Sequence, residues 1–386
     1  MAMRMTQAAP MIFGAGSLAV LGDELKNRGA KSAVIITDKG VTGAGVTAKV
    51  EDVIKAAGVG CSVWDECLSD APSDTIAVAA AAIRDSGADI IIALGGGSSM
   101  DTAKAASLII KEEKPIQAFM IGPGAKPGVP DLPVITIPTT SGTGSEVTVV
   151  GVISDSVTSN KFGVMITGPA LAIVDPELTV GLPPQITAMT GMDVIAHAVE
   201  AISGVGRNPL SDIRGFEALR LANAHLPGAV ADGKNIVARE GMSLASSLAG
   251  MAFNDSITSL GHAISQALAS AYHLHHGLLC GLATPPQLEI FATAIPQRIR
   301  KIGEIFGADI PADASPEQIG KITAVTMRSF MSKVGIPSFE QLGYSRKDIV
   351  DRTDALMAEF MKDLSPLPIT RDVAYRALDS MCDYEG

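Results

Sequence analysis

The pattern of hydrophobic positions divides the 386-residue chain into two parts near residue 185. Before that point, short hydrophobic, β-branched runs alternate with Ala-rich stretches of helical periodicity. The runs are KSAVIITD (31–38), CSVW (61–64), DIIIALGGG (89–97), PVITIP (133–138), VTVVGVIS (147–154), FGVMI (162–166) and LAIVDP (171–176). This alternation predicts βαβ units and a mainly parallel sheet. After LPPQ (182–185), helical periodicity continues almost to the end. We therefore predict an α/β domain over residues 1–182 and an all-helical domain over 183–386.

Composition and charge restrict the kinds of partner. Hydrophobic residues make up 47% of the chain, so we expect a globular protein with two buried cores. The net charge of −11 argues against a nucleic acid, whose phosphates need a basic surface. No apolar run reaches the roughly 18 residues of a membrane-spanning helix. The first residues, MAMRMTQAAPMIFGAG, lack the apolar segment of an export signal. We therefore expect a cytoplasmic protein with a small-molecule substrate and four reduced cysteines.

Two loops rich in glycine and hydroxyl residues follow predicted strands of the first domain. LGGGSSMDTAKAAS (94–107) opens a helix, whose first N–H groups can bind an anion. IPTTSGTGSE (137–146) offers hydroxyl groups for phosphate or ribose. Such loops at the ends of parallel strands are suited to a dinucleotide. GAGSLA (14–19) matches a weaker fingerprint, but only MIF precedes it, so we interpret it as a plain turn into a helix.

Asp38 ends the strand that precedes these loops in the chain. A carboxylate at this position can accept a hydrogen bond from a ribose 2′-hydroxyl and would repel a 2′-phosphate. The sequence therefore favours NAD over NADP.

Four of the six histidines lie in TSLGHAISQALASAYHLHHG (258–277) of the helical domain. Asp193 and His197, four residues apart in TGMDVIAHAVEAIS (190–203), share one helix face. A carboxylate among apolar residues is costly unless a cation pairs with it, and His262 and His276 are further candidate ligands. His262 and His276 are fourteen positions apart, and a straight helix of that length spans about 21 Å, too far for both residues to bind one ion. We therefore expect the helix to end near YHLHHG, with Gly277 as the breaker.

The motifs GGGSSMDTAK, TTSGTGSEVT, DPELTVGLPP, GMDVIAHAVEA, AGMAFN and HHG run almost the length of the chain. They resemble the iron-containing (group III) alcohol dehydrogenases, the family of lactaldehyde reductase and propanediol dehydrogenase. The resemblance implies a Rossmann-like first domain, an all-α metal domain of the dehydroquinate synthase type, and NAD(P)-dependent interconversion of alcohol and aldehyde or ketone.

The resemblance also implies site residues. The family's metal ligands fall on Asp193, His197, His262 and His276. Its cofactor contacts fall on Asp38, Gly96, Gly97, Ser98, Asp101, Thr139, Thr140, Thr148, Lys161, Leu178 and Gly181. Three imidazoles and a carboxylate suit Fe(II), with Zn(II) as the alternative.

One position departs from the family pattern. The family commonly has a second histidine four residues after the third ligand, and this chain has Gln266 there. In addition, Thr258 and Ser259 replace the Leu-Gly pair that in the family stands two residues before that ligand. Glutamine cannot titrate, so the proton path and the substrate contacts differ. We expect His273 to carry the proton or to contact the substrate, with His275 as the second candidate.

Three alternatives stay open at this point. The first is an NAD- and metal-dependent lyase of the dehydroquinate synthase type, whose acidic substrate would need more basic residues than Arg207, Arg214 and Arg220. The second is polyol oxidation of the glycerol dehydrogenase kind, and the third is a metal-stabilised binding protein without turnover. A homodimer or a larger homo-oligomer is the expected assembly.

Overall fold

The computed structural model describes residues 9–111, 114–122, 125–158 and 160–386. Two compact units divide the chain, one ending at Gly181 and one spanning Leu182–Gly386. In the first unit, six strands form one sheet in the order β1-β8-β5-β4-β2-β3, and every neighbouring pair is parallel. The strands are β1 (Met11–Phe13), β2 (Ser32–Ile36), β3 (Gly60–Trp64), β4 (Ile90–Gly95), β5 (Val134–Pro138) and β8 (Leu171–Val174).

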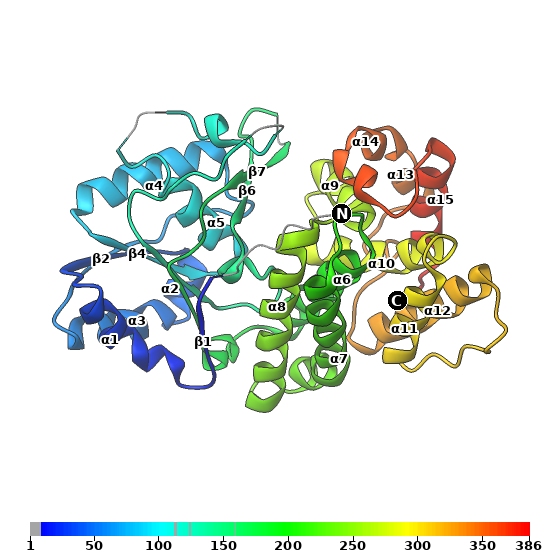
Figure 1. Cartoon of the computed structure of the whole chain (residues 1–386), viewed down its shortest axis with the longest axis horizontal. Helices are drawn as coiled ribbons and strands as arrows, with labels where there is room; N and C mark the ends of the chain where they lie inside the picture. The colour runs from blue at the N-terminus through cyan, green and yellow to red at the C-terminus, as the bar shows by residue number, and fades with distance from the viewer. Residues whose placement is uncertain (1–8, 112–113, 123–124, 159) are drawn as a thin grey trace. The chain divides into compact units, whose positions relative to one another are not determined.

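Helices cover both faces of this sheet. In β2, Ala33 and Ile35 pack with α1 (Leu21–Asn27) and α3 (Val46–Ala56), whereas Val34 and Ile36 pack with α4 (Ser73–Ser86) and α5 (Gly97–Ala106). Figure 1 shows α1 and α3 on one side of β2 and β4, and α4 on the other. Because both faces are buried, the strands read as continuous hydrophobic runs.

The runs at 147–154 and 162–166 do not join the parallel sheet. They form an antiparallel hairpin of β6 (Val150–Ser154) and β7 (Lys161–Met165). Near the start of the chain, the Asp175 carboxylate accepts from the N–H groups of Gly16 and Leu18, at 3.1 and 2.9 Å. The GAGSLA stretch is therefore a turn into the 3-10 helix η1 (Ser17–Val20) after an edge strand, as predicted.

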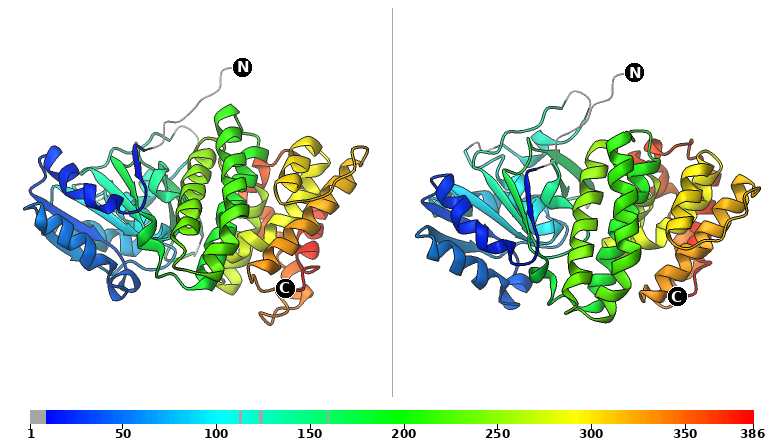
Figure 2. Two further views of the ribbon diagram at one scale, coloured as in Figure 1. Left: turned by 90° about the horizontal axis from the view of Figure 1, so that it is seen from below. Right: turned by 60° about the horizontal axis from the view of Figure 1, so that its bottom comes forward.

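The second unit, Leu182–Gly386, is described throughout and contains no strand. Its helices are α6 (Pro184–Ser203), α7 (Pro209–Ala231), α8 (Ile236–Ser256), α9 (Leu260–Tyr272), α10 (His276–Ala292), α11 (Pro296–Ile305), α12 (Pro316–Lys333), α13 (Arg346–Val350), α14 (Thr353–Ala358) and α15 (Arg371–Met381). The green helices α6, α7 and α8 lie side by side (Figure 2). None of the described helices combines the length and apolar character that crossing a bilayer requires. The predicted fold class, a parallel α/β unit followed by helices, is confirmed.

The break between α9 and α10 lies where the sequence predicts it, but Gly277 does not cause it. His273 ends α9 in the left-handed conformation, with φ of 51°, and α10 begins at His276. Gly277 sits in the first turn of α10, where a Cβ atom would lie 2.3 Å from the Met189 carbonyl oxygen. Glycine is needed there because α10 and α6 approach closely, and this approach brings His276 next to Asp193.

Candidate active site

The carboxyl ends of β2, β4 and β5 carry residues predicted to bind the dinucleotide. The chain leaves β2 toward β3 but leaves β4 toward β5, so the strand order reverses between β2 and β4. Ligands of open α/β sheets bind at such a switch point. Here the Ser99 hydroxyl donates to Asp38 Oδ2 at 2.9 Å, and the Val41 N–H donates to Asp38 Oδ1 at 3.0 Å. Asp38 is thus fixed beside the glycine loop.

The glycine loop after β4 leads directly into α5. Gly95 has φ of 143°, a conformation that side chains rarely adopt. A Cβ atom on Gly97 would lie 2.7 Å from Thr143 Cγ2, and one on Gly96 would lie 3.5 Å from Thr140. The absence of side chains on Gly96 and Gly97 therefore lets the Thr140 and Thr143 side chains lie against the first turn of α5. The N–H groups in the first turn of a helix attract phosphate.

Other residues predicted to contact the cofactor take part in polar contacts within the sheet unit. Asp101 accepts from the Ser145 hydroxyl at 2.5 Å, and Thr148 Oγ1 accepts from Lys104 Nζ at 3.1 Å. Lys104 is fully buried, and burial lowers the pKa of its ammonium to about 8. Asp101 Oδ1 also lies 3.8 Å from Lys104 Nζ, so two of the predicted contacts, Asp101 and Thr148, contact a buried lysine.

The remaining predicted contacts are spread along the unit. The Ser98 hydroxyl accepts from the Asp70 N–H at 3.0 Å, and Lys161 Nζ lies 2.6 Å from Asp70 Oδ1. The Thr139 N–H donates to the Gly95 carbonyl at 2.9 Å, which joins the two loops. Leu178 is buried in η4 (Pro176–Thr179), and Gly181 is exposed at the end of the unit.

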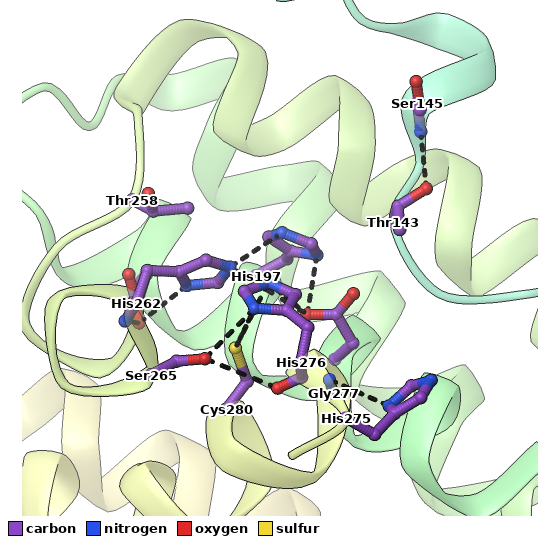
Figure 3. A network of polar contacts seen from close by, with 12 residues as sticks. Thr143, Ser145, His197, Thr258, His262, Ser265, His275, His276, Gly277 and Cys280 are labelled. Carbon is purple, nitrogen blue, oxygen red and sulfur yellow. Dashed lines mark hydrogen bonds and ion pairs between the residues drawn. The ribbon is translucent and has the colours of Figure 1, made fainter. Parts of the chain in front are cut away.

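The four predicted metal ligands come together in the helical unit. Figure 3 shows the rings of His197, His262 and His276 turned toward one another. The Nε2 atoms of His197 and His262 are 3.0 Å apart. Asp193 Oδ1 lies 3.7 to 3.9 Å from a ring nitrogen of each histidine. Three helices, α6, α9 and α10, therefore converge on one cluster of donor atoms.

The surroundings of Asp193 fit a cation. Its side chain is 2% exposed, and its Oδ1 accepts no hydrogen bond from the described residues. Burial alone would raise the pKa of Asp193, but the charges of His197, His276, His262 and His275 outweigh it and lower that pKa. A buried, ionised carboxylate beside three imidazoles is the donor set of a divalent transition metal.

Glu200 and Ser265, which were not predicted from the sequence, contact the rings of two of the histidines. Glu200, fully buried on α6, lies 3.2 Å from His262 Nδ1 and accepts from the His262 N–H at 3.0 Å. The Ser265 hydroxyl is 3.0 Å from His276 Nδ1 (Figure 3). Partners of this kind leave the other ring nitrogen facing the cluster. An acidic residue three positions after His197 on an apolar helix was the available signal for Glu200.

Cys280 is a further donor atom at this cluster, and its role was not predicted from the sequence. The group of donors whose ligand atoms all lie within 4.8 Å of one another is Asp193, His262, His276 and Cys280. His197 is outside this group, although its ring nitrogens lie 3.0 Å from His262 Nε2 and 3.7 Å from Asp193 Oδ1. The available signal was the spacing of four residues between His276 and Cys280, which places both on one face of α10.

The three residues expected near the reacting groups are not in this donor group. Gln266 is half-buried on α9, and His273 is exposed at the end of that helix. Within the described part of the chain, the His273 ring forms no hydrogen bond or ion pair. His275 is the N-cap of α10, and its Nδ1 accepts from the Gly277 N–H at 3.2 Å. Its charge is one of those that lower the pKa of Asp193.

Comparisons with known proteins match most of the chain. The profile "Iron-containing alcohol dehydrogenase" matches residues 8–176, and "Fe-containing alcohol dehydrogenase family, C-terminal" matches 187–380. A sulfoacetaldehyde reductase of Bilophila wadsworthia is 36% identical over 301 residues, 78% of this chain and 77% of that protein. An NAD-dependent methanol dehydrogenase of Bacillus methanolicus is 35% identical over 344 residues, 88% and 89% of the two chains.

A solved structure agrees in the same way. Sulfoacetaldehyde reductase from Bifidobacterium kashiwanohense in complex with NAD+ has a TM-score of 0.86 and 30% identity, and the match covers 100% of this chain and 98% of that one. The chain belongs to the iron-containing alcohol dehydrogenase family, which confirms the resemblance, the oxidoreductase class and the iron and NAD cofactors predicted from its sequence.

Proposed function

We propose that this enzyme transfers hydride between NAD(H) and a small alcohol or aldehyde, with a divalent metal, Fe(II) by preference, held by Asp193, His197, His262 and His276. The observation that carries the proposal is the buried, ionised Asp193 carboxylate among three imidazoles. When bound, the metal supplies Lewis acidity to the substrate oxygen, and NAD supplies the hydride acceptor.

The residues of the chain supply position and charge. Asp193 adds a negative charge to three neutral ligands, and Glu200 and Ser265 fix the rings of His262 and His276. In the sheet unit, Asp38 stands at the switch point beside the α5 N-terminus, which supports NAD rather than NADP. The predicted cofactor contacts at Gly96, Gly97, Ser98, Thr139 and Thr140 belong to the same edge.

The proton of the substrate oxygen needs a carrier other than Gln266, whose amide does not titrate. His273 and His275 are the candidates, and the electrostatic contact of His275 with Asp193 supports His275. The profiles of kcat against pH for His273→Ala, His275→Ala and the wild type decide between them. The profile should change for the variant that lacks the carrier, and three superimposable profiles would assign the proton to solvent.

The substrate class is tested by a screen with both cofactors. Short alcohols, diols, and aldehydes that include sulfoacetaldehyde should give NAD(H)-linked turnover that stops on chelation and returns with Fe(II). The relatives named above act on methanol and sulfoacetaldehyde, which supports this choice of compounds. Failure of every compound after metal loading, with metal bound, would overturn the proposed activity.

We infer a cytoplasmic homodimer or larger homo-oligomer. The four cysteines are free thiols, which suits a reducing compartment, and closed symmetric dimers are the commonest assemblies of soluble enzymes. Light scattering coupled to gel filtration measures the assembly directly, and a monomeric mass would overturn this part of the proposal.

A further inference from the structure

The donor cluster contains a sulfur atom that the proposed ligand set does not use. Cys280 is fully buried on α10, and its Sγ lies 3.5 Å from His276 Nε2. Figure 3 shows this side chain pointing toward the His276 ring. The sulfur therefore lies against the ring of a proposed metal ligand.

The spacing of these donors suits a single ion. Bonds of 2.0 to 2.3 Å separate two neighbouring ligand atoms by roughly 2.8 Å at a right angle and up to roughly 3.8 Å at the tetrahedral angle, which covers four- and five-coordinate ions. The distance from Cys280 Sγ to His276 Nε2 falls in that range, and those from Asp193 Oδ1 to His262 and His276 are 3.9 and 3.8 Å. The sulfur and His276 Nε2 therefore stand at a spacing that one ion can bridge.

A buried cysteine usually serves only as a small hydrophobic residue. Cys67, the other buried cysteine of the described chain, is of that kind, since it packs in the hydrophobic core of the sheet unit. Cys280 differs because its sulfur belongs to a group of four donors, one of which, Asp193 Oδ1, is buried without a hydrogen bond.

Resting on the proposed metal centre, we propose that Cys280 is an additional ligand of the ion, bound through its sulfur as a thiolate. As the sulfur–metal bond forms, the S–H bond breaks and its proton leaves to solvent, with no change of oxidation state. The second negative charge balances the charge of a divalent ion, and the soft sulfur shifts selectivity toward thiophilic ions such as Zn(II).

Cobalt(II) substitution of the full-length protein tests this inference without measuring activity. The apoprotein is prepared with a chelator and loaded with Co(II), whose visible d–d bands report binding and whose near-ultraviolet sulfur-to-cobalt band reports a thiolate. We expect the wild type and Cys67→Ala to show both features. Cys280→Ala and Cys280→Ser should keep the d–d bands and lose the sulfur band, and their Zn(II) to Fe(II) affinity ratio should fall.

The outcomes separate the two proposals. Visible bands without a sulfur band in the wild type would overturn the role of Cys280 and leave the metal centre standing. A protein that takes up no Co(II) would overturn the metal centre itself. If both Cys280 variants failed to fold, Cys61→Ala, Cys67→Ala and Cys382→Ala would decide the question: a sulfur band kept in all three leaves Cys280 as its cysteine, and a band lost in any one of them overturns the proposal.

Discussion

The sheet unit and the helical unit build their candidate sites by different physical means. At the sheet edge, glycines, hydroxyls and a helix N-terminus form the site, and Asp38 is only half-buried. In the helical unit, Asp193 and Glu200 place two carboxylates in the core, at 2% and 0% exposure. Buried charge is costly unless it is paired or bound to a cation. Single substitutions at the sheet site should therefore change cofactor preference only moderately. At the helical site, metal binding and activity should depend on the ion and on each donor residue.

The largest effect is expected for Asp193→Asn. Loss of several kcal/mol of Lewis-acid stabilisation lowers kcat by about a thousandfold, because each 1.36 kcal/mol is a factor of ten. Metal content measured by mass spectrometry should fall with it, while NAD binding persists. The control is Asp351→Asn, a carboxylate just after α13 whose side chain is 57% exposed. Full metal occupancy in Asp193→Asn would remove this residue from the ligand set.

The second effect concerns Glu200→Gln, which removes the charge facing His262 and presents an amide to N–H donors. Loss of a partner that orients a ligand costs about 10- to 100-fold in metal affinity. Competition with a chromophoric chelator measures this, and Glu200→Asp should restore part of the affinity. Glu217, whose side chain is 43% exposed, supplies the control variant, Glu217→Gln. Unchanged affinity with a lower unfolding midpoint would make Glu200 merely structural.

A smaller effect is expected at the sheet edge for Asp38→Asn. Asparagine keeps the hydrogen bond from Val41 but removes the charge that would repel a 2′-phosphate. The ratio of kcat/KM for NADP to that for NAD should rise by about tenfold, equivalent to about 1.4 kcal/mol. Asp52→Asn, an exposed change of the same charge on α3, is the control. A wild type that already prefers NADP would refute the role of Asp38.

The smallest effect is expected for Lys104, the one buried lysine among the described residues of the sheet unit. Burial lowers the pKa of Lys104 to about 8, whereas an unfolded lysine holds its proton to about pH 10.4. The unfolded chain thus binds more protons between about pH 8 and 10. This group therefore makes stability rise with pH, by at most about 1.4 kcal/mol per unit. Urea midpoints should show that Lys104→Met loses this rise and that the exposed Lys49→Met keeps it.

Much of the architecture could be predicted because its signals are local. Strand runs alternating with helices gave the parallel sheet, since side-chain periods of 2 and 3.6 are set by the backbone. The pair Asp193 and His197 needed only the four-residue spacing of a helix. The short MIF run correctly excluded a central strand before GAGSLA. Antiparallel pairing of the runs at 150–154 and 161–165 was not predicted, because pairing depends on which strands meet.

Other features were decided only by the tertiary structure. Ser99 meets Asp38 across 61 positions, and Glu200 meets the His262 backbone across 62, so no local period could reveal either contact. Gly277 had the sequence signature of a helix breaker, yet it serves the close approach of α10 to α6. Cys280 had no metal-binding spacing with another cysteine, and only the packing of three helices placed its sulfur among the histidines. These contacts form because the side chains of segments far apart in the sequence pack closely in the interior. Which segments meet depends on the volume and burial of all these side chains together.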